Sequence, residues 1–274
     1  MEILPGFKLL NHALLHNNTL IMSDIHIGYE EMLNKKGFLI PRLQFEDMLK
    51  RLEAIFDSLE SKKIGKVIIN GDLKHEFNSI SEQEWRNTLK FIDFLSKYCN
   101  EIIIVKGNHD ITLGPIARKR NVKVVDYYVI GNNADESNNE LYKDEKLQDG
   151  KNNNSRTKDA KNKTLIIHGD KVPEKKVLEG VGNIIIGHEH PAISLREGAR
   201  VEHFKCFLKG KFKGRNLIVL PSFNTIVEGT NLLRDEILSP FLKQKLDDFG
   251  VYIFEDKAYN FGKLGRLKKI LDKT

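Results

Sequence analysis

Short apolar runs that lead into acidic, amide or imidazole side chains recur along this chain. The clearest run, Ile102-Ile103-Ile104-Val105, is rich in β-branched residues, which favour a buried strand, and it leads into Lys106-Gly107-Asn108-His109-Asp110. Four similar runs lead into Asp24-Ile25-His26, Gly71-Asp72, His168-Gly169-Asp170 and Gly187-His188-Glu189-His190. The packing of a strand in the core does not require acidic, amide or imidazole side chains at its end. Because ligands bind at the carboxyl ends of strands in open α/β sheets, these side chains are candidates for a shared site.

Segments with helical periodicity lie between several of these runs. Apolar residues recur at helical spacing over residues 42–62, and Pro41 stands where a helix can begin. Ser81 followed by Glu84 matches the capping-box pattern, which predicts a second helix from that point. Gly114-Pro115 is expected to open a short helix, and residues 122–130 are expected to form one strand. Short strands, with a turn at residues 17–18, are expected over residues 1–20.

The final third of the chain is richer in strand patterns. Strands are expected over residues 192–195, 201–208, 216–220 and 251–254. We therefore expect two sheets within a single domain that spans residues 1–274. Residues 131–163 differ in kind, because they are rich in asparagine, balance acids against bases and contain few apolar side chains. That composition predicts a low-complexity, disordered insertion at 131–163, not a domain boundary.

Composition narrows the class of protein. A hydrophobic share of 40% in 274 residues supports a substantial core, and the formal net charge of +6 is a weak indication of a polyanionic partner. Cys99 and Cys206 are the only cysteines, and neither lies in a C-x-x-C motif, which argues against a thiolate metal site and a disulfide framework. No signal-like segment or long apolar run is present. We therefore expect a cytoplasmic location and no membrane partner.

The side chains that follow the predicted strands form a set of carboxylate, amide and imidazole donors without sulfur. The set comprises Asp24, His26, Asp72, Asn108, His168, His188 and His190. Donors of these types suit Mn²⁺, Zn²⁺, Fe or Co. Two such ions about 3.5–4 Å apart would need about seven or eight protein ligands, and they could hold both the attacking and the leaving oxygens of a phosphoryl displacement. The available donors match that number.

The order of these motifs resembles the calcineurin-like metallophosphoesterases. Asp-x-His, Gly-Asp, Gly-Asn-His-Asp, a strand-terminal His and Gly-His-x-His follow in the family order over residues 20–191. The resemblance implies a four-layer α/β/β/α sandwich, with two mixed sheets flanked by helices. It implies a first metal held by Asp24, His26 and His190, a second held by Asn108, His168 and His188, and a bridging Asp72. It also implies that a metal-bridging hydroxide attacks phosphorus, while His109 faces the phosphate and protonates the leaving oxygen.

Finer features resemble the archaeal phosphoesterases related to the DNA-repair nuclease SbcD, and the bacterial phosphoesterases associated with a DNA ligase and helicase. These features are residues 37–42, 71–75, 220–224 and 261–265. They favour a phosphodiesterase, with DNA or RNA among the candidate substrates and two Mn²⁺ as the favoured ions. The enzymatic alternative is a phosphomonoesterase or nucleotide phosphatase. The alternative of another class is a non-catalytic partner in a DNA-repair complex, and the sequence leaves open whether a homodimer forms.

Other residues have both a functional and a structural explanation. His75 follows the Gly-Asp motif and either contacts substrate or lies at the surface, and Arg42 either reaches a phosphate or is solvated. Asp110 is expected to orient His109 or to cap the next helix, whereas Glu189 is expected to be solvent-exposed. A basic run is explained by a solvated strand face or, alternatively, by a nucleic-acid track; it comprises Lys205, Lys209, Lys211, Lys213 and Arg215.

Overall fold

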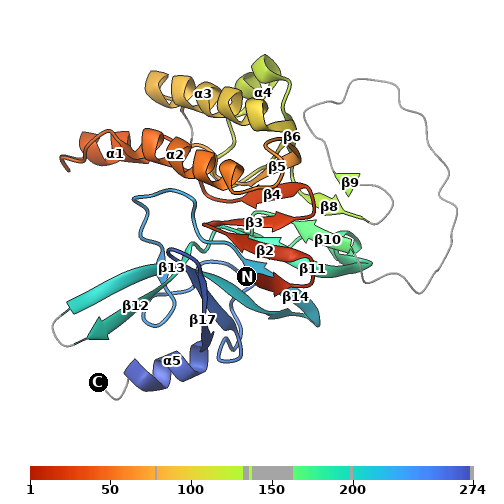
Figure 1. Cartoon of the computed structure of the whole chain (residues 1–274), viewed down its shortest axis with the longest axis vertical. Helices are drawn as coiled ribbons and strands as arrows, with labels where there is room; N and C mark the ends of the chain where they lie inside the picture. Colours follow the sequence, from red (N-terminus) through yellow and green to blue (C-terminus); the bar gives the residue numbers. More distant parts are fainter. Residues whose placement is uncertain (78, 132–135, 138–162, 198–199, 272–274) are drawn as a thin grey trace, which may run out of the picture.

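The two sheets of this protein face each other, and helices lie on the outer side of each (Figure 1). The structure is a computed structural model that describes residues 1–77, 79–131, 136–137, 163–197 and 200–271. Helices α1 to α4 cover one sheet, and α5 lies beside the other. This arrangement confirms the predicted α/β/β/α sandwich with two mixed sheets. Most of the predicted insertion at 131–163 lies outside the described residues.

The first sheet has seven strands, in chain order, within the described part of the chain. These are β1 (Glu2–Leu4), β2 (Phe7–Leu10), β3 (Ala13–His16), β4 (Thr19–Met22), β5 (Ile64–Asn70), β6 (Cys99–Val105) and β7 (Lys123–Val125). Strands β1 to β4 pair antiparallel, whereas β4 to β7 pair parallel. The carboxyl ends of β4, β5 and β6 therefore lie at one edge of the sheet, which is where their polar motifs begin.

The second sheet is assembled from the later strands, which run β15-β12-β13-β14-β11-β10-β8-β9 where the structure describes them, with β16 and β17 attached through β13. Their bounds are β8 (Tyr128–Ile130), β9 (Glu136–Ser137), β10 (Lys163–Ile166), β11 (Val181–Ile186), β12 (Pro191–Glu197), β13 (Arg200–Phe212), β14 (Arg215–Val219), β15 (Thr230–Asn231), β16 (Gly250–Phe254) and β17 (Ala258–Lys263). Strands β10, β11 and β14 are parallel, so their carboxyl ends also share one edge.

The helices are α1 (Tyr29–Lys35), α2 (Gln44–Asp57), α3 (Glu82–Tyr98), α4 (Gly114–Arg120), α5 (Leu264–Leu271) and a 3₁₀ turn at Lys175–Leu178. Ser81 caps α3 as predicted, because its Oγ accepts the N–H of Glu84 at 3.1 Å. The Glu84 carboxylate does not complete the capping box; it accepts the N–H groups of His75 and Glu76 at 2.7 and 3.0 Å. The sequence did not predict α1. Among the described residues, no helix combines the length and apolar composition needed to cross a bilayer.

Alternation along the strands separates the apolar core into layers. Ile68 and Ile103 point between the two sheets, whereas the next residues, Ile69 and Ile104, point toward α2 and α3. Phe207 of β13 enters the layer between the sheets and is fully buried. A third apolar cluster lies outside the second sheet, under α5 and the segment at 232–249. The layer between the sheets fixes the position of one sheet relative to the other.

The single strand predicted over residues 122–130 is wrong. The structure divides this segment into β7, which pairs with β6 of the first sheet, and β8, which pairs with β10 of the second. The chain passes from one sheet to the other at Asp126 and Tyr127. Side-chain alternation has the same period in both sheets, so the pattern cannot mark the crossing.

Phe207→Ala tests the layer between the sheets. Truncation of this fully buried ring should reduce the free energy of unfolding by about 3–5 kcal/mol, because the surrounding side chains cannot close the cavity. Urea denaturation measures the change. Val201→Ala on the same strand is the control, since Val201 is 48% exposed and its truncation should change stability by about 0.5 kcal/mol or less. Equal effects of the two substitutions would contradict this account of the core.

Candidate metal centre

The motifs that follow β4, β5 and β6 meet those that follow β10 and β11. Five of the predicted ligands adopt a left-handed backbone conformation there, with φ between 47° and 64°: Asp24, His26, Asp72, His188 and His190. Positive φ is uncommon in residues other than glycine and is concentrated at functional sites. The turns therefore direct these side chains inward where an ordinary strand end would not. No pattern in the sequence indicates this conformation.

A first group of donors consists of Asp24, His26, Asp72 and His190, whose ligand atoms all lie within 4.8 Å of one another. Asp24 Oδ1 lies 3.0 Å from His190 Nε2. His26 Nε2 lies 3.3 Å from His190 Nε2 and 3.8 Å from Asp72 Oδ2. Three of these side chains are buried and His190 is partly buried, so the group forms a small enclosed set of oxygen and nitrogen donors.

A second group consists of Asp72, His168 and His188, again with ligand atoms within 4.8 Å of one another. His168 Nε2 lies 3.4 Å from Asp72 Oδ2 and 3.2 Å from His188 Nδ1. Asn108 Oδ1 joins this group at 3.0 Å from His168 Nε2. Asp72 therefore belongs to both groups, and the seven residues predicted as ligands all lie in one or the other.

Each carboxylate is held mainly through one oxygen and presents the other to the histidines, although the N–H of His188 also lies 3.3 Å from Asp24 Oδ1. Asp72 Oδ1 accepts the backbone N–H of His109 at 2.9 Å, which leaves Oδ2 facing His26 and His168. Asp24 Oδ2 accepts the hydroxyl of Ser23 at 2.6 Å and the N–H of His188 at 3.1 Å, which leaves Oδ1 facing His190. Hydrogen bonds that fix one oxygen orient the other for a ligand.

Two glycines allow the strand ends to approach this closely. A Cβ at Gly107 would collide with Asp72 Oδ1, and a Cβ at Gly187 would collide with Ser23 Oγ and Asp24 Oδ2. Any side chain at these positions would displace the carboxylates. The glycines of the Gly-Asn-His-Asp and Gly-His-x-His motifs are therefore required by the packing of the site itself.

The residues present fit divalent cations. In the part of the chain that the structure describes, the ion-pair partners of Asp24 and Asp72 are histidines, and neither carboxylate pairs with Lys or Arg. Imidazole nitrogens face each other in the pairs His26–His190 and His168–His188, an arrangement that a shared cation explains. Oxygen and imidazole donors without sulfur suit Mn²⁺, Zn²⁺, Fe or Co.

The electrostatics of the group follow from burial and mutual charge. Burial alone would raise the pKa of Asp72, but its hydrogen bond to His168 and the surrounding histidines hold it well below the ordinary value. Burial opposes the charged form of His168, yet Asp72 and Asp24 raise its pKa to about 10. Burial and the neighbouring His190 lower the pKa of His26. An imidazole must be neutral to bind a cation, so protons and cations compete for His168.

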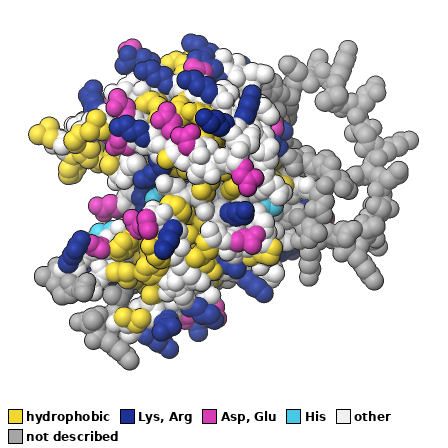
Figure 2. Space-filling view, viewed as in Figure 1, with side chains coloured by type: hydrophobic (Ala, Val, Ile, Leu, Met, Phe, Trp, Pro, Cys, Tyr) yellow, Lys and Arg dark blue, Asp and Glu magenta, His cyan; other side chains and the backbone are white. Residues whose placement is uncertain are grey.

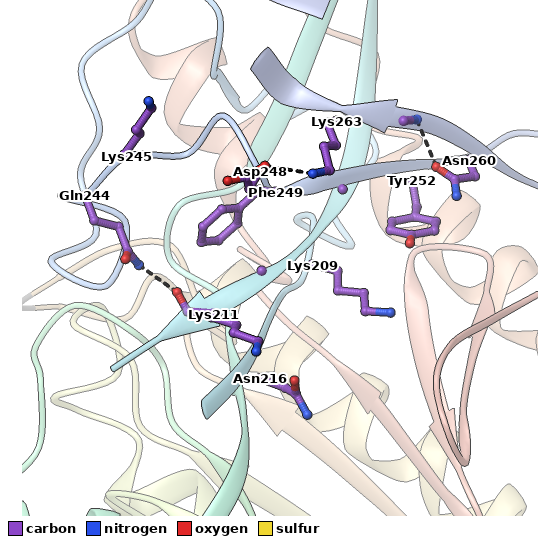
Figure 3. A pocket seen from close by; sticks show the side chains of 13 residues that line it. Lys209, Lys211, Asn216, Gln244, Lys245, Asp248, Phe249, Tyr252, Asn260 and Lys263 are labelled. Carbon is purple, nitrogen blue, oxygen red and sulfur yellow. Dashed lines mark hydrogen bonds and ion pairs between the residues drawn. The ribbon is translucent and has the colours of Figure 1, made fainter. Parts of the chain in front are cut away.

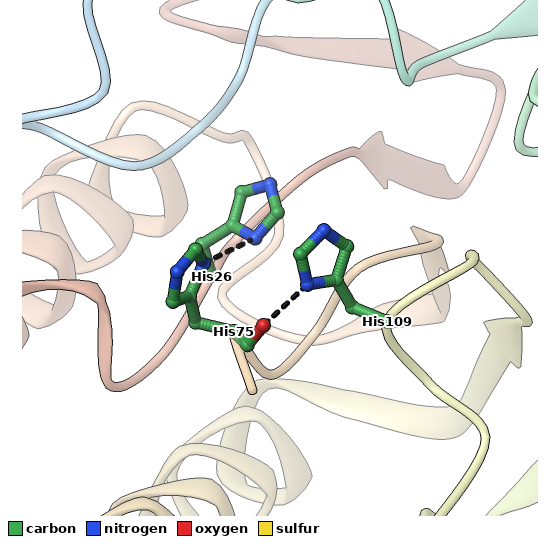
Figure 4. Close-up of side chains that lie close together, drawn as sticks. All are labelled: His26, His75 and His109. Carbon is green, nitrogen blue, oxygen red and sulfur yellow. Dashed lines mark hydrogen bonds between the residues drawn. The ribbon is translucent and has the colours of Figure 1, made fainter. Parts of the chain in front are cut away.

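His109 and His75 lie beside the first group (Figure 4). His109 Nδ1 donates to the carbonyl of His75, and His109 Nε2 lies 3.8 Å from Asp72 Oδ2. The His75 ring lies with its Nδ1 3.4 Å from His26 Nδ1, so this residue is part of the site and not a plain surface histidine. The exposed ring of Phe77 covers His109 at a centroid distance of 3.6 Å. The sequence did not single out Phe77.

Asp110 holds two loops together. Its buried carboxylate accepts the N–H of Leu73 at 3.1 Å and that of Gly107 at 3.0 Å, which ties the loop of Asp72 to the loop of Asn108. Burial and the neighbouring Asp72 raise the pKa of Asp110 to about 7. The expected roles in orienting His109 or capping a helix differ from these contacts, because the backbone of His75 orients His109.

Two further sequence expectations need correction. Glu189 is fully buried, and its carboxylate accepts the N–H groups of Leu238 and Ser239, so the prediction of solvent exposure is wrong. Lys205 does not share the solvated face of the basic run, because its Nζ donates to the carbonyls of Ser222 and Asn224. Burial lowers the pKa of Lys205 to about 7.

The segment at 220–224 holds the loop at residues 24–26, which carries two ligands of the first group, through hydrogen bonds to its backbone. Ser222 Oγ donates to the carbonyl of Asp24 at 2.7 Å, and Asn224 Nδ2 donates to the carbonyls of Ile25 and His26 at 2.9 and 3.2 Å. Lys205 holds this segment in turn. Arg42 is exposed and, among the described residues, forms no hydrogen bond or ion pair with the site. The structure therefore brings together every predicted site residue except Arg42.

The comparisons with known proteins agree with this geometry. The family model for calcineurin-like phosphoesterases matches residues 18–249. The crystal structure of the nuclease MPE from Pseudomonas putida is similar in fold, with a TM-score of 0.55 and 17% identity, over 89% of this chain and 90% of that one.

Two other solved structures are similar at lower scores. A protein of unknown function, AQ665 from Aquifex aeolicus, has 17% identity and a TM-score of 0.34, over 62% of this chain and 77% of that one. Vacuolar protein sorting 29 from Cryptosporidium parvum has 12% identity and a TM-score of 0.36, over 89% and 97%. No curated protein sequence matches the chain. The family match covers most of the chain, all five motifs and both groups of donors, and the chain belongs to the calcineurin-like phosphoesterase family.

Proposed function

We propose that this chain is a cytoplasmic phosphodiesterase that binds two divalent metal ions, with Mn²⁺ as the favoured ion, and acts on DNA or RNA. Membership of the family already implies a metal-dependent phosphoesterase. The observation that carries the dinuclear proposal is the position of Asp72, whose Oδ2 faces both groups of donors. Because each sheet supplies part of the site, we also propose that residues 1–274 form one domain.

The side chains divide between two ions as follows. Asp24, His26 and His190 would hold the first, Asn108, His168 and His188 would hold the second, and Asp72 would be shared. When bound, such ions act as Lewis acids toward phosphoryl oxygens and lower the pKa of water. The hydrogen bonds to Asp24 and Asp72 fix the free oxygens in advance, which reduces reorganisation when the substrate binds.

His109 is the proposed proton donor to the leaving oxygen. Its Nδ1–H is held by the carbonyl of His75, so the ring keeps Nε2 on the side of Asp72 and of the donor groups. Burial lowers the pKa of His109 from its ordinary value, which makes its protonated form a stronger acid toward an alkoxide. The same carbonyl fixes the ring in the way that a carboxylate does in other catalytic dyads.

Three observations support a nucleic-acid substrate. The features that resemble SbcD-related phosphoesterases include residues 220–224, and in the structure this segment supports the metal loop. The protein of similar fold from Pseudomonas putida is described as a nuclease. Phe77 offers an aromatic surface, 49% exposed, beside His109, and aromatic side chains stack on the bases of single strands.

The substrate proposal predicts a preference between two chromogenic esters. Hydrolysis of bis(p-nitrophenyl) phosphate should have a higher kcat/KM than hydrolysis of p-nitrophenyl phosphate. Chelation should abolish both activities, and Mn²⁺ should restore them, because the donor groups then regain their cations. A clear preference for the monoester would favour the phosphatase alternative. Full activity after exhaustive chelation would exclude metal-dependent catalysis.

Asp72→Ala should have the largest effect of any single ligand substitution. The carboxylate belongs to both donor groups, so its loss should lower kcat/KM by about 10³-fold or more, which corresponds to about 4 kcal/mol of transition-state stabilisation. Elemental analysis should show loss of both metals. Asp47→Ala is the matched control, since Asp47 lies on the exposed face of α2. Retention of two metals by Asp72→Ala would contradict the shared position.

His109→Ala separates metal binding from proton transfer. The variant should keep its metals, because His109 is absent from the two groups that contain Asp72 and belongs to a separate group of three histidines, His26, His75 and His109. Its kcat should fall about 10²–10⁴-fold, as for loss of a general acid. A substrate with a better leaving group should reduce the deficit, since p-nitrophenolate needs less protonation than an alkoxide. Parallel loss of metal content would instead identify His109 as a ligand.

A further inference from the structure

A second site candidate lies at the other end of the second sheet. A cavity of about 570 Å³ is lined by residues of β13, β14, β16 and β17 and by the segment at 244–249 (Figure 3). Asn216, near the amino end of β14, lies in its wall, whereas the carboxyl end of the same strand leads to Ser222 at the metal loop. At about 3.3 Å per residue, about 20 Å of chain separates the two residues. The cavity is therefore distinct from the metal centre.

The cavity concentrates positive charge. Lys209 and Lys211 stand two residues apart on β13, which places both on one face of the strand. Within the described residues, neither forms an ion pair with a carboxylate. Lys263 also lines the cavity but is paired with Asp248 at 2.7 Å. On the face of the molecule shown in Figure 2, basic and acidic side chains are interspersed.

The remaining lining suits a planar, polar group. The half-buried ring of Tyr252 lies in the wall, and its partner strand supplies Asn260. Asn216 Nδ2 donates to Asn183 Oδ1 at 2.9 Å, which leaves its carbonyl oxygen as an acceptor. Asn260 Oδ1 accepts the N–H of Gly262 at 2.8 Å, which leaves its amino group as a donor. The wall thus combines an aromatic ring, an acceptor and a donor.

We propose that this cavity binds a phosphorylated nucleoside, either free or as one unit of a strand. Lys209 and Lys211 would contact the phosphate, Tyr252 would stack on the base, and the two asparagine amides would contact the base edge. The volume lies within the range of small-molecule sites. Inorganic phosphate would use the lysines alone and leave the aromatic and amide lining without a role. Binding of a free nucleotide does not depend on the proposed function. Binding of one unit of a strand rests on the proposed function, because it requires a nucleic-acid substrate.

The test compares two double substitutions in the full-length, metal-loaded protein. Lys209→Gln/Lys211→Gln removes two charges inside the cavity. Lys90→Gln/Lys97→Gln removes two charges from exposed positions on α3, outside the cavity and outside the basic run, and is the matched control. Isothermal titration measures binding of adenosine 5′-monophosphate, ribose 5-phosphate and inorganic phosphate. Hydrolysis of bis(p-nitrophenyl) phosphate, with and without the nucleotide, reports occupancy of the metal centre separately.

The first variant should bind adenosine 5′-monophosphate about 10-fold more weakly or worse, and the control should change it less than about 2-fold. Both should retain the melting temperature and the diester turnover of the wild type. Tyr252→Leu should reduce the preference for adenosine 5′-monophosphate over ribose 5-phosphate, because the aromatic surface for the base is removed while an apolar side chain still packs against the layer between the sheets. Equal weakening in both double variants, or a nucleotide bound no more tightly than inorganic phosphate by the wild type, would overturn the proposal.

A fluorescent dT₁₂ oligonucleotide with hydrolysis-resistant phosphorothioate linkages distinguishes the two sources of the ligand. If one unit of a strand occupies the cavity, Lys209→Gln/Lys211→Gln should reduce the slope of log affinity against log salt by about 0.7 for each phosphate that the two lysines neutralise, and the control should not. If the free nucleotide is the ligand, the slope should stay the same while binding of adenosine 5′-monophosphate weakens. Absence of diester hydrolysis would refute the proposed function without altering the titration of the nucleotide.

Discussion

The apolar layer between the two sheets is the constraint on which the site depends. Isoleucines at 68, 103, 166, 185 and 218, with Phe207, fill this layer and fix the distance and angle between the sheets. Three parallel strands of each sheet then end at the same edge. Donors that are remote in sequence, such as Asp24 and His190, lie 3.0 Å apart because this close-packed layer brings the two sets of strand ends together. The metal centre is in this sense a product of the core.

The unfavourable features of the metal centre are partly compensated by hydrogen bonds from neighbouring residues. Two carboxylates are buried, and five ligands adopt a left-handed backbone conformation. Imidazole nitrogens also face each other in the pairs His26–His190 and His168–His188. Each feature is unfavourable in an isolated protein chain. The backbone N–H groups of His109 and His188, together with Ser222 and Asn224 beneath the first loop, offset part of this cost. A bound cation would stabilise this arrangement, because it would neutralise the carboxylates and bind the facing imidazole nitrogens. Metal binding and stability of the fold are therefore coupled.

Sequence reasoning found the parts of the structure that depend on local pattern. Strand runs such as Ile102–Val105, the Ser81 cap and the donor residues are visible because period, capping and ligand type are properties of short segments. It failed where a distant contact decides the outcome. The buried carboxylate of Glu189 accepts N–H groups of Leu238 and Ser239, about fifty residues away. Lys205 turns inward because its ammonium group donates to backbone carbonyls of the segment at 222–224. The crossing at Asp126 changes the sheet without changing the side-chain period, so no local signal exists.

The second sheet carries different chemistry at its two ends because only its middle is apolar. Ile166, Ile185 and Ile218 form adjacent buried positions on β10, β11 and β14, and two residues earlier on each strand the same face carries Thr164, Asn183 and Asn216, joined by hydrogen bonds at 3.2 and 2.9 Å. A polar row at the amino end is compatible with the fold only if its groups are paired with one another or with something outside the sheet. The row ends at Asn216, in the wall of the cavity that holds Lys209 and Lys211. The donor groups at the carboxyl end collect negative charge and imidazole, whereas the amino end collects cations. The hydrogen bonds along the row satisfy most of its polar groups, and a phosphorylated ligand would meet the lysines at this end without entering the metal centre.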